Sequence, residues 1–174
     1  MKKGLLLIAM LAITLSASAQ KFGVKGGLNF SKVKVNTLGV SAFAEGKTGF
    51  YLGGLVDFKL SEKFHVQPEV LFSLEGSDNL DFTFVNIPVL AKYYVTEKLN
   101  IQAGPHFGFI LDSDANTDSL KTLNLGVDVG LAYELDNGLF FDVRYNHGIS
   151  NLVKDGVGTE FYERAYQLGL GYRF

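Results

Sequence analysis

The 174-residue sequence contains no cysteine, no tryptophan and only three prolines. Without cysteine the chain can form no disulfide framework, no thiolate metal site and no cysteine nucleophile, and it lacks the lipidated cysteine of a bacterial lipoprotein. Sixteen basic and eighteen acidic residues give a formal charge of −2, so there is no basic excess to hold nucleic acid. A hydrophobic fraction of 47% argues against disorder. Length and composition therefore indicate one modest folded domain.

Long apolar runs are also scarce, and the longest lies at the N-terminus. Two lysines precede the apolar residues 5–15, a run about half as long as the ~20 residues that a membrane-spanning helix needs. A positive start, a short apolar segment and the small-residue pattern Ala17-x-Ala19 are typical of a secretory signal peptide. We expect residues 1–19 to be this signal peptide and residues 20–174 to form the exported domain; a membrane anchor is the alternative.

From residue 21 onward the hydrophobic pattern has a period of two. Apolar residues fall on one face, and charged, polar or glycine residues fall on the other, which predicts strands rather than helices. The alternation recurs in eight segments, which are residues 21–31, 49–60, 65–75, 85–95, 101–109, 123–134, 139–146 and 166–174. Phe82 and Phe84 break the alternation of their segment, so we expect a bulge or a loop rim there.

The predicted connections alternate in length. Tight turns are expected at residues 61–63, 96–98 and 136–138, where the last is Asp-Asn-Gly, a sequence that readily adopts positive φ. Polar links lie near residues 33–47, 76–81, 112–121 and 149–162. Short turns at one end, longer loops at the other and an even number of strands are typical of an outer-membrane barrel. Both mature termini would then lie on the short-turn, periplasmic side.

Whether the barrel is soluble or spans a membrane depends on which face of its strands contacts water. A soluble eight-stranded barrel packs its apolar face inward, whereas here the opposite face carries glycines and charges that could fill a narrow lumen. We therefore predict an all-β, eight-stranded antiparallel transmembrane β-barrel, an up-and-down meander with a polar, side-chain-filled lumen. The predicted structural network of the lumen contains Lys25, Asp57, Glu69, Lys92, Asp128, Asp142 and Arg144. Two outward aromatic girdles are expected, Phe22, Phe58, Tyr93, Tyr133 and Phe141 at one end and Phe30, Phe50, Phe109 and Tyr145 at the other.

Within this network we expect Arg144 to be held inside the barrel. Pairing across the turn at 136–138 places Arg144 opposite Gly130, with Asp128 one diagonal step away and Asp142 on the same face of its own strand. An enclosed guanidinium is costly unless it is charge-paired and hydrogen-bonded. Asp128, Asp142 or both are therefore the predicted partners, and a selectivity constriction for anions is the alternative.

Three segments resemble a known family. The mature start KFGVKGGLNFS, then VNIPVLAKYY with LNIQAGPHFGFIL, and finally FDVRYNHGISNL are similar, in this order, to the PorT-like outer-membrane β-barrel family of Bacteroidetes. The final Phe174, on a strand with Tyr172, resembles the C-terminal signal read by the barrel-assembly machinery. The resemblance implies a barrel in the outer membrane of a Gram-negative bacterium. It does not fix an activity, because fold alone does not define function, and the secretion role of PorT is not carried over to this short chain.

Residues that could support chemistry are few. His147 and Ser150, with Asp155 or Glu160 as an acidic partner, are candidates for a lipid-modifying hydrolase, but their spacing does not ensure hydrogen-bond reach. His65 and His106 are expected in the polar lumen rather than at a metal. Residues 112–118 place acids and an amide at alternate positions like the start of an EF-hand loop, yet Thr117 replaces the required glycine and Leu123 the bidentate glutamate. We therefore expect no cofactor and no metal.

The function that these features favour is non-enzymatic. We expect an integral outer-membrane protein with an envelope-structural role or a surface-interaction role. Its expected partners are outer-membrane lipid, the barrel-assembly machinery during insertion, and an unidentified surface partner at loops 33–47 and 149–162. Transport of small solutes is the alternative, which a narrow eight-stranded lumen disfavours.

Overall fold

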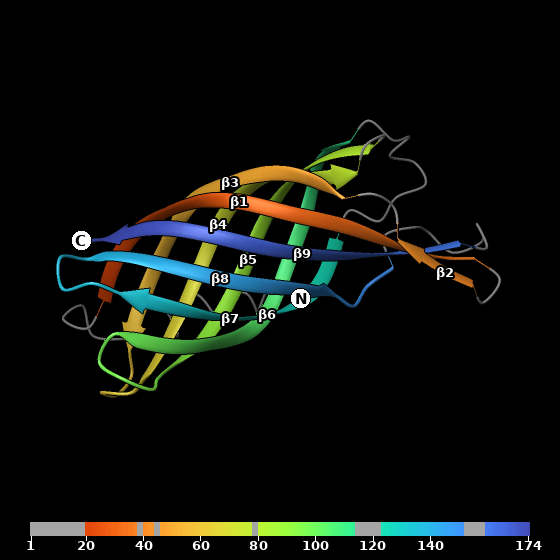
Figure 1. The fold of residues 1–174 in the computed structure, drawn as a ribbon. Coiled ribbons are helices and arrows are strands. Elements are labelled where there is room, and N and C mark those ends of the chain that lie inside the picture. The colour runs from red at the N-terminus through yellow and green to blue at the C-terminus, as the bar shows by residue number, and fades with distance from the viewer. Residues whose placement is uncertain (1–19, 38–39, 44–45, 78–79, 114–122, 152–158) are drawn as a thin grey trace, which may run out of the picture.

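The computed structural model describes residues 20–37, 40–43, 46–77, 80–113, 123–151 and 159–174. Its strands are β1 (Gln20–Thr37), β2 (Val40–Phe43), β3 (Lys47–Lys59), β4 (Phe64–Ser77), β5 (Leu80–Tyr94), β6 (Leu99–Ser113), β7 (Leu123–Glu134), β8 (Leu139–Gly148) and β9 (Thr159–Arg173). The strands β1 and β3 to β9 pair antiparallel in chain order, and β1 also pairs with β9, so the sheet closes (Figure 1). The predicted eight-stranded antiparallel meander barrel is confirmed. Among the described residues, no helix is long and apolar enough to cross a membrane.

The interior of the barrel is polar and its outer wall is apolar. In β7, for example, Asp128 is 1% exposed while the neighbouring Val129 is 46% exposed. Across the described residues, 21 buried side chains are polar or charged and nine are hydrophobic. A soluble barrel would have the opposite distribution, so the strand alternation directs the apolar face to lipid.

The lumen also contains large apolar side chains that the strand pattern did not single out. Among the fully buried ones are Tyr51, Leu71, Phe84, Leu90 and Phe140. An eight-stranded barrel has an interior just wide enough for side chains to fill, so these residues and the polar network pack against each other. The guanidinium of Arg173, for instance, lies 4.6 Å from the centre of the Phe140 ring.

The three tight turns lie where the sequence predicts them. The amides of Leu60, Val95 and Leu135 each donate to a carbonyl at the start of the next strand, over distances of 2.8–3.0 Å. Gly138 has a φ of 90°, a backbone conformation that L side chains rarely adopt. These turns connect β3 to β4, β5 to β6 and β7 to β8, so they lie at one end of the barrel (Figure 1).

The opposite end has more strand than we predicted. Within the predicted loop at 33–47, β1 continues to Thr37 and pairs with the short strand β2. Within the predicted loop at 149–162, β9 begins at Thr159, and its ladder with β1 reaches the pair Thr37 and Thr159. The polar composition of these segments suggested loops, but backbone pairing between β1 and β9 continues beyond the apolar part of the wall (Figure 1).

The irregularity expected around Phe82 and Phe84 is present. The pairing of β5 with β6 shifts register between Thr83 and Phe84. Phe84 points into the lumen and is 2% exposed. The extra residue at this shift is Leu111 on β6, and burial alternates regularly along β5 from Thr83 to Leu90. Phe84 therefore keeps the inward position of its strand, and the apolar pattern is interrupted because a large apolar side chain fills the lumen there.

Candidate functional site: the charged barrel interior

All seven residues of the predicted network lie in the lumen and are at most 3% exposed. They come from six strands, with Lys25 on β1, Asp57 on β3, Glu69 on β4, Lys92 on β5, Asp128 on β7, and Asp142 and Arg144 on β8. Strand alternation places each on the inward face, and closure of the sheet brings them together. They form two linked groups.

The first group crosses the middle of the barrel. Arg144 donates from Nη1 to Glu69 Oε2 and from Nη2 to Glu69 Oε1, both at 2.9 Å. Lys25 donates to Asp142 Oδ2 at 2.7 Å, and its ammonium lies 3.8 Å from Glu69. These contacts connect β1, β4 and β8 through charged side chains. A two-bonded arginine–carboxylate pair is among the stronger polar contacts in proteins, so this group restrains the walls of the barrel against one another.

Arg144 has the neighbours that the sequence predicts and one partner that it does not. The residue lies opposite Gly130, 3.5 Å from Asp142 and 3.7 Å from Asp128. Its two hydrogen bonds nevertheless go to Glu69 on β4. Glu69 belongs to the predicted network but was not a predicted partner, because pairing rules for adjacent strands carry no information about contacts across a lumen.

The second group lies nearer the short-turn end and is centred on Lys92. The ammonium donates to Asp57 at 2.7 Å, to Glu134 at 2.8 Å, to Tyr94 at 3.1 Å and to Gln67 at 3.2 Å. Arg173 adds an ion pair with Glu134 and lies 3.7 Å from Asp57. Glu134 and Arg173 are missing from the predicted network, although their place on the polar face of their strands was a signal that could have found them.

The two lumen histidines pair with carboxylates. His65 Nδ1 lies 2.5 Å from Asp57, and His106 Nδ1 lies 3.3 Å from Asp128. Nε2 of His106 lies 3.2 Å from the side-chain oxygen of Asn86. Within the described ranges, no group of three or more histidine, cysteine, aspartate or glutamate side chains could hold a metal ion. Asp57 and Asp128 thus join the histidines to the polar interior.

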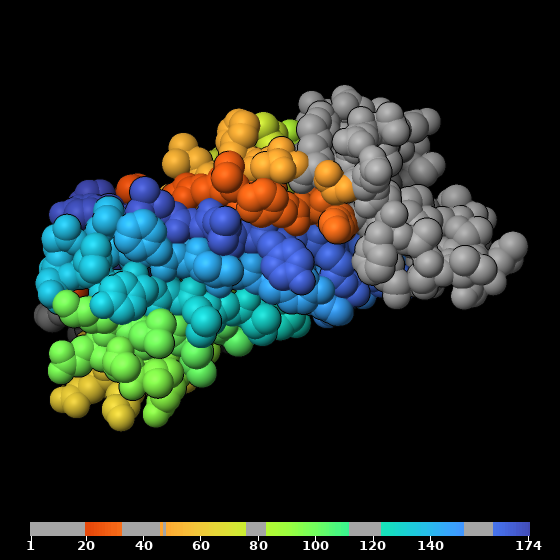
Figure 2. Space-filling view, in the orientation of Figure 1, coloured from red at the N-terminus to blue at the C-terminus, as the bar shows by residue number. Residues whose placement is uncertain are grey.

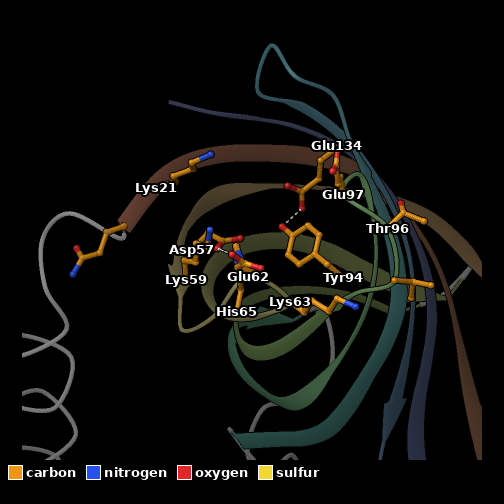
Figure 3. Close-up of a pocket in the computed structure, with 12 residues that line it drawn as sticks. Lys21, Asp57, Lys59, Glu62, Lys63, His65, Tyr94, Thr96, Glu97 and Glu134 are labelled. Carbon is orange, nitrogen blue, oxygen red and sulfur yellow. Dashed lines mark hydrogen bonds and ion pairs between the residues drawn. The ribbon is translucent and has the colours of Figure 1, made fainter.

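A cavity of about 600 Å³ opens at the short-turn end. Its residues come from the short-turn ends of β1, β3, β4, β5 and β7 and from two of the turns. Figure 3 shows lysines and acids around the opening, with a hydrogen bond between Tyr94 and Glu134. The lining consists of Gln20, Lys21, Asp57, Lys59, Glu62, Lys63, His65, Tyr94, Val95, Thr96, Glu97 and Glu134. Because Asp57 and Glu134 are bound to Lys92, the charged group described above forms the deep side of this cavity.

The candidate hydrolase residues have other contacts. Ser150 Oγ accepts from the Leu125 amide at 2.7 Å and donates to Asn124 Oδ1 at 3.1 Å. His147 is exposed on the outer wall, with Nδ1 3.3 Å from the Tyr145 hydroxyl. These bonds orient Ser150 toward β7 and give it a structural role at the rim. Asp155 and the side chain of Glu160 lie outside the described residues, as do the side chains of the predicted calcium segment 112–118.

The comparisons with known proteins agree with this geometry. Residues 18–154 match the outer membrane protein beta-barrel domain family, and the chain belongs to that family. It is therefore an outer-membrane β-barrel protein of the Gram-negative envelope. No curated protein sequence matches it.

Several solved barrels share the fold. Ail, the attachment invasion locus protein of Yersinia pestis, aligns at a TM-score of 0.56 with 17% identity, covering 88% of this chain and 98% of Ail. Neisserial surface protein A aligns at 0.58 with 16% identity, covering 88% of this chain and 97% of that protein. OprG from Pseudomonas aeruginosa aligns at 0.50 with 16% identity, covering 90% and 96%. At these identities the likeness concerns the fold alone.

Proposed function

We propose that the protein is a non-enzymatic outer-membrane barrel with an envelope-structural or surface-interaction role. The observation that carries the proposal is the ion-paired interior, in which Arg144, Glu69, Lys25 and Asp142 connect walls that are not adjacent in the sheet. A lumen filled in this way favours a rigid wall over a passage for solutes. Function would then depend on the surface that the barrel presents at its long-loop end.

Electrical recording in planar lipid bilayers tests this proposal against solute transport. We expect the purified protein to insert without a steady conductance, because charged side chains occupy the lumen at two levels. A stable, voltage-tolerant open state would contradict the proposal and favour a channel. A well-characterised open porin in the same bilayer provides the control for insertion.

The surface partner is proposed to bind at loops 33–47 and 149–162. Two predicted loops on one end, joined through the paired outer parts of β1 and β9, would form one continuous surface. Pull-downs from outer membranes should compare the intact protein with a variant whose residues 152–158 are replaced by a short Gly-Ser linker, which keeps Ser150 and its bonds to β7. A partner retained equally by both proteins would argue against binding at this surface.

The placement in the membrane is part of the same proposal. We infer that residues 1–19 are removed as a signal peptide and that both mature termini face the periplasm, because Gln20 and Phe174 lie at the end of the barrel with short turns. Mass spectrometry of the exported protein should find Gln20 as its first residue. Protease added to intact cells should cleave an epitope inserted near residue 155 and leave a C-terminal epitope untouched.

The finer family assignment is also a proposal. We infer a PorT-like barrel of Bacteroidetes from the three segments KFGVKGGLNFS, VNIPVLAKYY with LNIQAGPHFGFIL, and FDVRYNHGISNL. These segments lie on β1, β5, β6 and β8, which are four of the eight strands of the barrel. A family-wide sequence comparison that groups the chain with other outer-membrane barrels instead would contradict this assignment.

A further inference from the structure

Two glutamates meet inside the barrel, outside the two ion-paired groups described above. Glu75 on β4 and Glu163 on β9 are each 5% exposed, and their carboxyl groups are in hydrogen-bond contact. The strands β1 and β3 lie between β4 and β9 in the sheet, so the contact is made across the lumen. Glu75 lies near the end of β4 and Glu163 near the start of β9, which places the pair at the long-loop end (Figure 1).

The pair lies beyond the outward aromatic girdle of this end. Glu163 is three residues closer to the long loops than Tyr166, which lies opposite both Phe30 and Tyr145. Outward aromatic residues of this kind mark the boundary between hydrocarbon and headgroups, and rings are visible on this wall in Figure 2. The two glutamates are therefore enclosed in the part of the barrel that extends past the hydrocarbon.

Amide side chains orient both carboxyl groups. Asn86 Nδ2 donates to Glu75 Oε1 at 2.9 Å, and Asn124 Nδ2 donates to Glu163 Oε2. Asn124 Oδ1 also accepts from Ser150 Oγ at 3.1 Å, so hydrogen bonds connect the pair to the residues that follow β8. An amide donor fixes the position of a carboxyl group but adds no positive charge to compensate it.

The described charges around the pair do not compensate it either. Among the described residues, no ion pair involves Glu75 or Glu163, and Asp128 on β7 adds a third negative charge that acts on Glu163. His106 on β6 is bonded to Asp128 and to Asn86, at 3.3 and 3.2 Å. The charged or titratable side chains that face outward on the adjoining strands are Lys32, His147 and Arg164. On β3, Lys47 shares the inward register of Gly49, and its side chain lies outside the described residues.

We propose that Glu75 and Glu163 form a proton-dependent latch that closes the long-loop end of the lumen. Two carboxyl groups in contact attract each other when they share one proton and repel each other when both are ionised. With the proton, the pair joins β4 to β9 across the lumen. Without it, repulsion separates the two walls and pulls Glu163 away from Asn124. The latch goes beyond the proposed function and does not depend on a surface partner.

The latch determines the direction of the pH dependence. A glutamate of the unfolded chain loses its proton at about pH 4.3, whereas the folded pair keeps one proton to higher pH. Above that pH the folded state therefore binds more protons than the unfolded state. Folding then weakens as the pH rises, by up to about tenfold in the equilibrium constant for each pH unit.

Urea unfolding of the purified protein in phospholipid vesicles, between about pH 5 and about pH 9, tests this dependence. EDTA is present throughout, so that no divalent cation replaces the proton. In Glu163→Gln the side-chain amide can donate to Glu75 without a titratable proton, and we expect this variant to exceed the unmodified protein about tenfold in the folding equilibrium constant at about pH 8. Glu97→Gln, in an exposed turn at the opposite end, is the matched control and should follow the unmodified protein.

Infrared spectroscopy detects the shared proton directly. At about pH 7 we expect the unmodified protein to show a carbonyl band of a protonated carboxyl group that Glu163→Gln and Glu75→Gln both lack. The absence of this band overturns the proposal. Equal pH dependence of the unmodified protein and both variants overturns it as well, and is the result expected if Lys47 compensates the pair. If Glu163→Gln does not fold, Glu75→Gln provides the same comparison, because it leaves the bond between Asn124 and Glu163 in place.

Discussion

Arg144 and Glu69 are 75 positions apart in the sequence and form two parallel hydrogen bonds of 2.9 Å inside the barrel. Both side chains are at most 1% exposed. Arg144 also lies within 4 Å of Asp128 and Asp142, so the guanidinium has three carboxylates around it. The positive charge of Arg144 thus compensates carboxylates on three strands, β4, β7 and β8. Its hydrogen-bonded pair with Glu69 connects β8 to β4 on the opposite wall of the barrel.

Replacing Glu69 by alanine should strongly destabilise the barrel. The change leaves Arg144 without its hydrogen-bonded partner, and breaking a buried ion pair from one side costs about 3–5 kcal/mol in the free energy of unfolding. Urea unfolding in phospholipid vesicles, followed by tyrosine fluorescence, measures this loss. The double variant Glu69→Leu with Arg144→Met should lose less than Glu69→Ala, because it leaves no buried arginine without its hydrogen-bonded partner. A single variant as stable as the unmodified barrel would contradict the proposed structural role of the pair.

Two neighbouring glycines of β3 should respond differently to alanine. A Cβ at Gly53 would lie 2.0 Å from the Val70 carbonyl oxygen and 2.8 Å from Leu71 Cα, so Gly53→Ala should disrupt the pairing of β3 with β4. At Gly54 the nearest atom is the Gly23 carbonyl oxygen at 3.8 Å, and Gly54→Ala should fold normally. Refolding yield into detergent micelles, read from the gel mobility of unheated samples, compares the two. Equal yields would show that the backbone at Gly53 can move aside.

Lys92 should matter more for stability than another lysine at the same end of the barrel. Its ammonium is enclosed by Asp57, Glu134, Gln67 and Tyr94, so Lys92→Met should cost about 3 kcal/mol in the free energy of unfolding by leaving two carboxylates less compensated. Lys59→Met, at the exposed edge of the cavity, is the control and should change it by less than about 0.5 kcal/mol. Thermal unfolding followed by circular dichroism compares the two variants. If Lys92→Met lowers the free energy of unfolding as little as Lys59→Met does, the acids around Lys92 are held by Arg173 and His65 alone.

Ser150→Ala should leave membrane lipids unchanged. The hydroxyl is used to bond Asn124 and the Leu125 amide, so its loss should loosen the junction of β8 with the loop that follows. Mass spectrometry of lipid A from cells that produce the protein, the variant or neither is expected to give one acyl pattern. A pattern that depends on Ser150 would favour the lipid-modifying alternative.

Deleting Phe174 should impair assembly in cells more than it impairs the finished barrel. Its side chain is 74% exposed, and its ring contacts Tyr172 at a centroid distance of 5.5 Å, while its amide bonds the Phe22 carbonyl at 2.9 Å. We expect less protein in the outer membrane, because the resemblance to a C-terminal assembly signal would be lost. Refolding of the purified variant into micelles is the control, and equal reductions in both settings would point to a purely structural role.

Much of the fold could be predicted because its information is local. Alternation along residues 123–134, for example, places Asp128 and Leu131 on opposite faces whatever their partners are, and the turn at 136–138 then fixes that Gly130 lies opposite Arg144. The same reasoning predicted strands that are too short at the long-loop end of the barrel. Val33 and Val35 fall on the positions that are polar or glycine in residues 21–31, so the apolar pattern of that segment stops before them. The strand β1 nevertheless continues to Thr37, because β9 supplies backbone partners.

The sequence by itself determined the chemistry of each face, which follows from the two-residue repeat of a strand. It also determined that the charged face had to be enclosed, since lipid cannot solvate it. Only the tertiary structure decided that Glu69 meets Arg144 and that Glu134 and Arg173 complete the group around Lys92. These contacts depend on closure of the sheet and on the relative shift of its strands, which bring residues together by position around the barrel rather than by distance along the chain.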